Sequence, residues 1–368
     1  MKWLKRTLII LVALGALGYL AYQLVTLLPQ FGGEPEGSRL GRVKASPEYS
    51  GGRFENTPPQ SKNDEFIKTI KFYIQGQVRE PASDIPVIDI TSYELAQPPD
   101  SGLSAIWLGH ASVLVEINGV RLLSDPVLSD RVSPLPIGPT RLHRAPIKME
   151  DLRGIDAVLI SHDHYDHLDM PTTKALAQKG TQFFVPLGIG AHLERWEVQP
   201  EQIHEMEWWQ SVDFKGITIN CTPARHYSGR KKMDNSTLWS SWFVKGPKNS
   251  FYFSGDTGYA PHFREIQNRL GTPNMTLMKV GAYGEPESWN DIHMNPEDAI
   301  KAQMDLGAEI LLPVHWATFD LAYHAWSEPI LRTLEAASGK PVTVATPRVG
   351  ERFTYGAPFT NMEWYTDL

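Results

Sequence analysis

Residues 158–170 read VLISHDHYDHLDM and gather imidazole and carboxylate side chains within a few positions. Imidazole nitrogen and carboxylate oxygen are the donor types that bind zinc or a similar first-row metal. Side chains alternate along a chain that leaves a strand, so His162 and His164 can share one face while Asp166 and His167 turn toward a second point. The spacing predicts two adjacent metal ions.

More residues of the same donor types follow other predicted strands. His226, Asp256 and His315 each stand at the end of such a strand, and Asp256 lies in a glycine-flanked turn, SGDTG, that lets the backbone bend tightly. Loops at one edge of a sheet meet in a single crevice, so these three residues can converge on the first cluster. Asp125 either orients a ligand histidine or caps a turn, and His110 either supports a ligand or is a satisfied buried histidine.

The elements that must position these residues alternate between strand and helix. The sequence Asn118-Gly119 predicts a type I′ turn in an opening β-hairpin. The predicted strands are Ser104–Leu108, Ser112–Ile117, Val120–Ser124, Asp156–Ser161, Gln182–Pro186, Gly216–Thr222, Leu238–Val244, Ser250–Ser254, Met275–Val280, Glu309–Val314 and Val342–Ala345. The predicted helices are Pro171–Lys179, Gly188–Val198, Pro261–Leu270, Pro296–Leu306 and Glu328–Ala337. His192 and His204 are expected to be ordinary helix and loop residues.

Composition indicates a globular protein. The chain has 368 residues, of which 42% are hydrophobic and 21% are charged. The net charge of −7 and a pI near 6.0 give no global attraction to nucleic acid, so no nucleic-acid partner is expected. The single cysteine, Cys221, excludes an intramolecular disulfide and a thiolate metal cluster. A metal site in this chain must therefore use histidine and carboxylate.

The amino end predicts a membrane anchor. Thr7–Leu28 carries no charge, and at about 1.5 Å per residue its roughly 22 residues would span a bilayer core. Lys2, Lys5 and Arg6 precede it, which favours a cytoplasmic N-terminus and a periplasmic catalytic domain in the cell envelope, with the inner or outer membrane left open. The alternative is a cleaved signal peptide, because Ala16-Leu17-Gly18 is a small-x-small site.

Three parts are expected along the chain. Residues 1–30 form the anchor or signal segment. Residues 31–99, rich in Gly, Pro, Ser and Asn, form a tether with a docking helix at Asn63–Tyr73. Residues 100–368 form one hydrolase domain of the α/β class, since about 270 residues are near the upper end for a single core.

Several motifs together carry a family resemblance. HDHYDH, PARHYSGR, SGDTGY, IHMNPEDA and PVHWATF resemble the metallo-β-lactamase superfamily, whose fold is an αββα sandwich, and within it the N-acylphosphatidylethanolamine-hydrolysing phospholipase D family and bacterial envelope relatives of the RomA type. The resemblance covers about residues 106–318. It implies two zinc ions per chain held by seven side chains: His162, His164 and His226 for one ion, Asp166, His167 and His315 for the other, and Asp256 bridging the pair.

The resemblance also assigns roles in the reaction. Asp166, Asp256 and His293 are the expected catalytic residues, and His293 matches a family histidine beside the substrate phosphate. Tyr283 and Trp289 flank the ligand loops and either contact acyl chains of the substrate or pack in the core. Arg230-Lys231-Lys232 follows His226 and either attracts a phosphate or forms a solvated face.

The expected function is therefore hydrolysis of a phosphodiester in a phospholipid by a metal-bridging hydroxide. No histidine is followed two positions later by lysine, which excludes the phosphohistidine route of the other phospholipase D class. The same centre can instead open a lactone, a β-lactam or another acyl bond, and a non-catalytic envelope protein that affects permeability is a third hypothesis. Iron or manganese can replace zinc in such a site. The expected partners are a phospholipid or other small ester and a membrane, and no particular oligomeric state is predicted.

Overall fold

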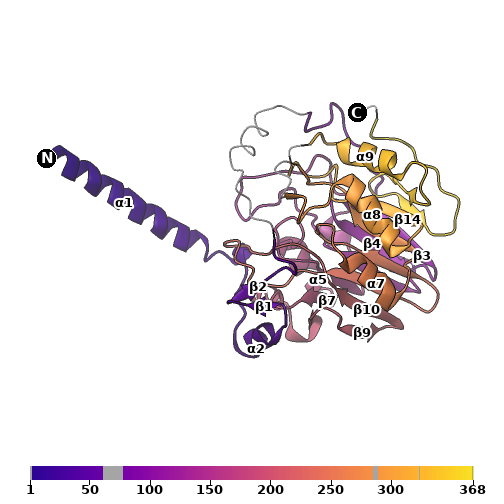
Figure 1. Cartoon of the computed structure of the whole chain (residues 1–368), viewed down its shortest axis with the longest axis horizontal. Helices are drawn as coiled ribbons and strands as arrows, with labels where there is room; N and C mark the ends of the chain where they lie inside the picture. The colour runs from indigo at the N-terminus through magenta and orange to yellow at the C-terminus, as the bar shows by residue number, and fades with distance from the viewer. Residues whose placement is uncertain (1, 61–77, 285–288, 323, 367) are drawn as a thin grey trace.

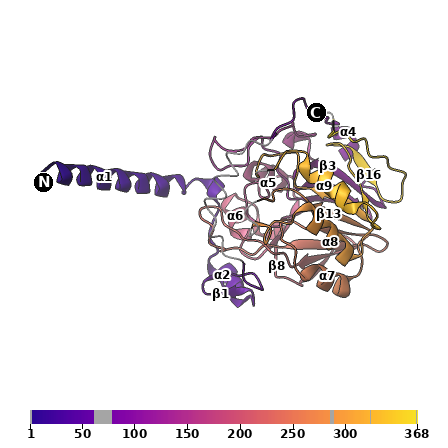
Figure 2. The ribbon, with the colours of Figure 1, turned by 45° about the horizontal axis from the view of Figure 1, so that its top comes forward.

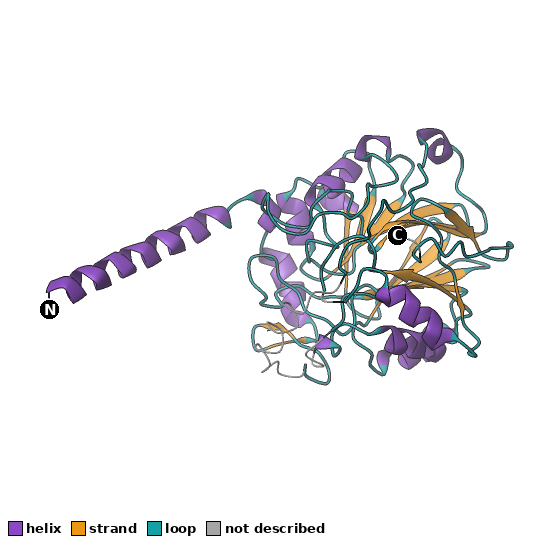
Figure 3. Cartoon of the chain, turned by 90° about the horizontal axis from the view of Figure 1, so that it is seen from above, coloured by secondary structure: helices purple, strands orange, loops and turns teal. Residues whose placement is uncertain are grey.

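A computed structural model describes residues 2–60, 78–284, 289–322, 324–366 and 368. Its body is a stack of four layers, with two β-sheets face to face and helices on both outer sides (Figure 3). This is the αββα sandwich that the family resemblance implies. The docking helix predicted at Asn63–Tyr73 lies outside the described residues.

The first sheet has seven strands in the order β16-β3-β4-β5-β6-β7-β8. Its strands are β3 (Leu103–Gly109), β4 (Ser112–Ile117), β5 (Val120–Ser124), β6 (Ala157–Leu159), β7 (Gln182–Pro186), β8 (Ile203–Met206) and β16 (Arg352–Thr354). β16, β3, β4 and β5 pair antiparallel, and β5 to β8 pair parallel. Asn118 and Gly119 both have positive φ, at 50° and 79°, as the predicted type I′ turn between β4 and β5 requires.

The second sheet repeats this arrangement in the order β15-β14-β13-β12-β11-β10-β9. Its strands are β9 (Ser211–Phe214), β10 (Ile217–Thr222), β11 (Ser241–Lys245), β12 (Ser250–Phe253), β13 (Met275–Lys279), β14 (Ile310–Val314) and β15 (Thr343–Val344). β9 to β12 pair antiparallel and β12 to β15 pair parallel. Each sheet thus has a parallel half, whose strand ends gather loops at one edge.

The central strands are buried on both faces, which explains why helices cover both sheets. In β4, Val113 and Val115 belong to the core between the sheets, whereas Leu114 packs in the cluster beneath the outer helices. Helices α5 (Met170–Ala177) and α6 (Gly190–Arg195) cover the first sheet, and α7 (His262–Leu270), α8 (Pro296–Leu306) and α9 (Glu328–Ala337) cover the second (Figure 2).

The first 60 residues contain regular helices and a two-stranded sheet. Helix α1 (Lys2–Val25) projects from the body (Figure 1), and its exposed side chains include Ile9, at 66%. The elements that follow are η1 (Pro29–Phe31), α2 (Gly37–Ala45), β1 (Tyr49–Ser50) and β2 (Arg53–Phe54), with α4 (Ser92–Ala96) after the undescribed gap. Over the described part of the chain, no helix combines the length and apolarity needed to cross a membrane, so the predicted anchor is not confirmed.

Some predicted elements differ from the structure. The strand predicted at Leu238–Val244 begins only at Ser241, because the Leu238 and Ser240 amides donate to carbonyls of Leu187 and Ser161 instead of joining the sheet. His204 lies in β8 rather than in a loop. The edge strands β8, β9 and β16 were not predicted, since three or four residues are too few for a clear period-2 pattern.

Candidate metal centre

Three histidines converge at the ends of β6 and β10. His162 Nε2 and His164 Nδ1 lie 2.9 Å apart, and His226 Nε2 lies 3.3 Å from the same His164 nitrogen. Bonds of about 2.1 Å at the tetrahedral angle separate neighbouring donor atoms by about 3.4 Å. These three side chains, which we call the first donor group, can therefore hold one metal ion.

Hydrogen bonds from the other ring nitrogens fix how two of these histidines face the centre. Ser161 Oγ donates to Asp125 at 2.5 Å, so it accepts from His162 Nδ1, which is 2.8 Å away. His226 Nδ1 donates to the Ile292 carbonyl at 3.1 Å. In both rings the proton is on Nδ1, which leaves the Nε2 lone pair for a metal.

We call Asp166, His167 and His315 the second donor group. His110 lies beside it. Asp166 Oδ2 lies 3.3 Å from His167 Nε2 and 3.4 Å from His315 Nε2. His110 Nε2 is closer still, at 2.9 Å from the same oxygen. Asp125 accepts the His167 Nδ1 proton at 2.7 Å, so Nε2 again faces the centre. Of the two readings offered for Asp125, orientation of a ligand histidine is the one that the contacts support.

Asp256 borders both donor groups. Its Oδ1 lies 3.1 Å from His315 Nε2, and its Oδ2 lies 3.5 Å from His167 Nε2 and 3.8 Å from His226 Nε2. Gly255 allows this approach, because its φ is 54° and a Cβ there would come within 2.5 Å of the Ser161 Cβ. The glycine-flanked turn thus delivers the carboxylate to a shared position.

Burial and charge set the protonation of the site. Burial raises the pKa of Asp166 and Asp256, but the facing histidines outweigh it and hold both pKa values well below the usual range. Burial lowers the pKa of His167, yet Asp256, Asp166 and Asp125 together raise it well above its ordinary value. Burial dominates at His226 and lowers its pKa to about 3. The first donor group is therefore neutral imidazole, the form that binds metals, and the carboxylates are ionised.

The donor set fits a metal pair. His167 Nε2, His315 Nε2 and Asp256 Oδ1 are buried, and none has a hydrogen-bond partner among the described residues. Buried polar atoms are rarely left in this state without a ligand. Together with the donor spacing, these orphaned atoms match the all-histidine and carboxylate site that the sequence predicts, although the number of ions and the metal remain predictions.

A cleft of about 380 Å³ opens onto this centre. It is lined by Val132, His164, Tyr165, Asp166, Tyr227, Gly229, Arg230, Lys231, Lys232, Met233, Asp256, Ala282, Trp289, His293, His315 and Leu321. His293 Nδ1 lies 3.5 Å from Asp256 Oδ2, so it stands beside the donor groups and faces the cleft. Trp289 lines the same cleft.

Tyr283 is placed differently from Trp289. Its hydroxyl donates to Glu328 at 2.8 Å, its ring stacks on His324, and it is not among the described residues that line the cleft. The substrate contact expected of Tyr283 therefore has no support from its position.

Arg230 is not part of a solvated face. It is 7% exposed, and its guanidinium donates to the carbonyls of Gln30, Asp163 and Leu168. Lys231 and Lys232 of that basic run also line the cleft, where Lys231 Nζ pairs with Glu34 at 3.2 Å and Lys232 Nζ pairs with Asp234 at 3.3 Å.

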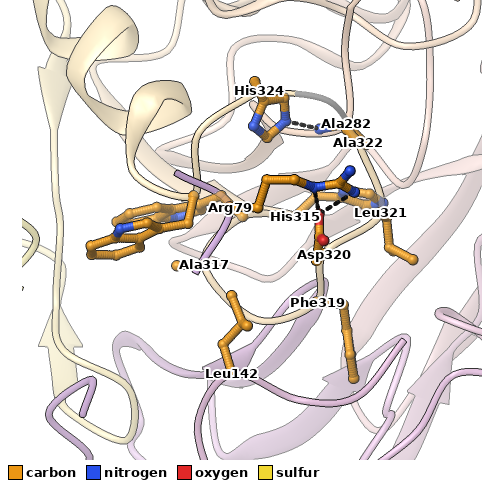
Figure 4. Close-up of a pocket in the computed structure, with 12 residues that line it drawn as sticks. Arg79, Leu142, Ala282, His315, Ala317, Phe319, Asp320, Leu321, Ala322 and His324 are labelled. Atoms are coloured by element: carbon orange, nitrogen blue, oxygen red, sulfur yellow. Dashed lines mark hydrogen bonds and ion pairs between the residues drawn. The ribbon is translucent and has the colours of Figure 1, made fainter. Parts of the chain in front are cut away.

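A smaller cavity of about 20 Å³ adjoins His315 (Figure 4). Its wall includes an ion pair in which Arg79 donates to Asp320 at 2.7 Å, and His324, which accepts from the Ala282 amide at 2.9 Å. The volume has room for about one water molecule. Of these two cavities, only the larger cleft has room for a substrate.

Comparison with known proteins identifies the family. A "Beta-lactamase superfamily domain" matches residues 120–316, which contain all seven predicted metal ligands. The chain belongs to the β-lactamase superfamily. Among solved structures, the metallo hydrolase Igni18 of Ignicoccus hospitalis has the superfamily fold with a TM-score of 0.54 and 22% identity, over 70% of this chain and 99% of that one.

Curated superfamily relatives include lipid hydrolases. An uncharacterized protein of Mycobacterium tuberculosis is 43% identical over 330 residues, 87% of each chain. An N-acyl-phosphatidylethanolamine-hydrolyzing phospholipase D of Caenorhabditis elegans is 37% identical over 251 residues, 65% of this chain and 70% of that protein. The outer membrane protein RomA of Klebsiella pneumoniae is 40% identical over 99 residues, 27% of this chain and 74% of that protein. The predicted resemblance is confirmed, and the chain is a metal-dependent hydrolase of the superfamily whose fold implies divalent metal binding.

Proposed function

We propose that this superfamily member is a dinuclear zinc phosphodiesterase of phospholipase D type that acts on N-acylphosphatidylethanolamine-like lipids. The observation that carries the proposal is the carboxylate shared by both donor groups, Asp256, within 3.1 Å of His315 and 3.8 Å of His226. Two ions held by these donor groups would polarise phosphate oxygens and activate water. Water then adds to phosphorus as the bond to the N-acylethanolamine oxygen breaks, which leaves phosphatidic acid.

The chain's own residues position the diester. Burial and the nearby Lys279 charge lower the pKa of His293 well below its ordinary value, so the imidazole is neutral near pH 7 and can donate one hydrogen bond to a phosphate oxygen. Asp166 and Asp256 stay ionised at that pH because their pKa values are depressed. They supply the negative charge that balances the cations.

The cleft suits an anionic amphiphile. Lys231 and Lys232 bring positive charge to one wall, where each is paired with a carboxylate that a substrate phosphate would compete with, and Met233, Trp289 and Leu321 provide apolar surface. A phosphodiester with acyl chains presents both features. The activity for which the Caenorhabditis elegans relative is named supports the same substrate class.

A substrate panel tests the proposal. We expect release of phosphatidic acid from N-acylphosphatidylethanolamine in mixed micelles, and no comparable ring opening of lactones or β-lactams. Ring opening without phospholipid turnover would contradict the phosphodiesterase proposal and favour the acyl-bond alternative, which uses the same centre.

Metal content tests the dinuclear centre separately. We expect about two zinc ions per chain after purification without added metal, and a loss of at least one ion with at least a hundredfold loss of turnover in Asp256→Asn. Asp213→Asn is the matched control, because Asp213 is exposed in β9, away from the cleft. Fewer than one metal per chain in the wild type would overturn the centre, and iron or manganese in place of zinc would correct its identity.

We also propose that the protein works at a membrane of the cell envelope, with α1 in contact with the lipid. Exposed apolar side chains on α1, among them Ile10, Leu14 and Leu17, support this location. So does the partial similarity to RomA. Tyr22 Oη donates to the Lys231 carbonyl at 3.1 Å, which places the base of α1 at the cleft wall.

A further inference from the structure

The loop that carries His226 is held by residues that lie outside the matched superfamily domain. The segment after β2, residues 55–59, precedes the region that matches the superfamily by about 60 positions, yet it lies against His226. Asn56 is 7% exposed and meets the backbone of His226 twice. Its Nδ2 donates to the His226 carbonyl at 2.7 Å, and its Oδ1 accepts from the His226 amide at 3.1 Å.

These two bonds satisfy the backbone amide and carbonyl of His226, a predicted metal ligand. His226 is fully buried, and a buried amide and carbonyl each need a partner. Among the described residues the partner of both groups is the Asn56 side chain. An asparagine can serve in this way because its side chain carries one donor and one acceptor, the same pair that a neighbouring strand would offer.

The residue before His226 is held by the same segment. Arg225 donates to the carbonyls of Pro58 and Pro59, and its guanidinium also makes a bidentate pair with Asp291 at 2.8 and 2.7 Å. Asp291 precedes Ile292, whose carbonyl fixes the His226 ring. The ligand loop is therefore clamped between an N-terminal segment and the loop that carries His293.

Apolar packing fixes the segment itself. Phe54 is fully buried in a cluster with Val43, Leu187, Ala224, Leu238 and Trp239. The Phe54 amide donates to the Asn235 carbonyl at 2.9 Å, and Asn235 Nδ2 donates back to the Phe54 carbonyl at 3.2 Å. Phe54 is therefore fixed in place, and Asn56 follows it by two positions.

We infer that Asn56 is a positioning residue for the metal centre: through its two bonds to the His226 backbone, it sets where His226 Nε2 stands relative to His162 and His164. This inference rests on the proposed metal centre. It makes the N-terminal segment part of the active site, although the segment lies outside the domain that the family shares. Groups that orient metal ligands typically change metal affinity by 10 to 100-fold when they are removed.

The test is Asn56→Asp in the full chain, with cobalt as the probe. The aspartate keeps the size of the side chain and the acceptor for the His226 amide, but it loses the donor to the carbonyl. We expect at least a tenfold weaker affinity for one of the two Co²⁺ ions in competition with a chelator, and a changed visible absorption of the Co²⁺ protein. Asn56→Leu, which loses both bonds, should give a larger change in the same direction.

Asn361→Asp is the matched control. Asn361 also bonds to the backbone twice, accepting from the Thr346 amide and donating to the Val344 carbonyl, both at 2.8 Å. It holds the C-terminal segment to the body without touching a donor residue. We expect this variant to lose thermal stability while its Co²⁺ affinities and spectrum match the wild type.

The outcomes separate this inference from the proposed function. If the folded Asn56 variants have wild-type Co²⁺ affinities and spectra, Asn56 does not position the ligand. If Asn56→Asp fails to fold while Asn361→Asp folds, the residue serves general stability, and the inference is again overturned. A wild type that takes up no Co²⁺, Zn²⁺, Mn²⁺ or Fe²⁺ would instead overturn the metal centre itself.

Discussion

At the scale of single residues, one buried carboxylate orients ligands in both donor groups. Asp125 accepts directly from His167 Nδ1 in the second group and, through the Ser161 hydroxyl, determines the orientation of His162 in the first. It also accepts from the Ser161 amide at 2.7 Å. Asp125 therefore links the two donor groups, which Asp256 also borders.

We expect Asp125→Asn to weaken metal binding at both sites. The amide oxygen carries no full negative charge, so the His167 ring loses a charge-assisted bond, and so does the Ser161 hydroxyl that holds the His162 ring. Zinc affinity measured by chelator competition should fall 10 to 100-fold for each ion. Asp213→Asn again serves as the control, and loss at one ion alone would contradict the coupling.

The site residues that can be predicted from the sequence are those marked by a local motif or by the end of a predicted strand. HDHYDH places four donors side by side, and strand ends explain how His226, Asp256 and His315 reach them. Asn56 gave no comparable signal, because its partner His226 lies 170 positions away and asparagine in a Pro-rich stretch is typical of a turn. The choice between roles for His110 also needed coordinates, which place its Nε2 at 2.9 Å from Asp166.

At the scale of elements, the strand ends and helix starts around the cleft follow simple local rules. The structure starts α8 at the predicted Pro296, because Asn295 Oδ1 accepts from the Asp298 amide at 2.8 Å. Each predicted strand is present, and the start of the Leu238–Val244 strand shifted because it depends on long-range bonds. Leu238 and Trp239 are apolar like a strand, yet they pack with Phe54 and leave the sheet.

The cap of α8 gives a stability prediction. Asn295→Ala should lower the free energy of unfolding by about 1 kcal/mol, because the Asp298 amide loses its acceptor at the helix start. Urea unfolding of the metal-free chain measures this change without a contribution from metal binding. Ser327→Ala is the control, since Ser327 precedes α9 without a side-chain cap bond, and an equal loss there would show that capping is not the cause.

At the scale of the whole molecule, the N-terminal segment joins the projecting helix to the active site. α1 extends from the body (Figure 1), and the residues that follow it bond to Arg230 and then to His226. The expected division into anchor, tether and domain misses this continuity, because composition shows a Gly- and Pro-rich stretch but not what it packs against. A substrate drawn from a membrane at α1 would meet the cleft wall first.

Vesicle binding tests the membrane role of α1. Leu14 and Leu17 are 59% and 62% exposed, and burying such side chains in lipid is worth about 1.5–3 kcal/mol each. We expect the full-length Leu14→Glu/Leu17→Glu variant to bind phosphatidylcholine vesicles at least tenfold more weakly in sedimentation. Leu331→Glu, at an exposed position on α9, should bind like the wild type. Equal binding by all three proteins would exclude α1 as the contact.

Buried neutral histidines make the stability of the whole molecule sensitive to acid. Burial, aided by Arg141, lowers the pKa of His143 from an ordinary value of 6.5 to about 3, and its ring nitrogens bond to the Arg144 carbonyl and Thr318. Below pH 6.5 the unfolded chain binds a proton at this position that the folded chain does not bind until about pH 3. Stability must therefore fall as pH falls through this window, by up to about 1.4 kcal/mol per pH unit for one histidine.

His143→Gln should remove that slope. Glutamine does not titrate, so unfolding free energies of the variant from urea titrations between pH 7 and pH 5 should fall less steeply than those of the wild type, by about 1.4 kcal/mol per pH unit near pH 5. The slope is informative even if glutamine lowers stability at every pH, since lost packing does not titrate. His204→Gln at a half-buried position should change the slope less. An unchanged slope in His143→Gln would mean that His143 takes up its proton in the folded chain, against the burial that the structure shows.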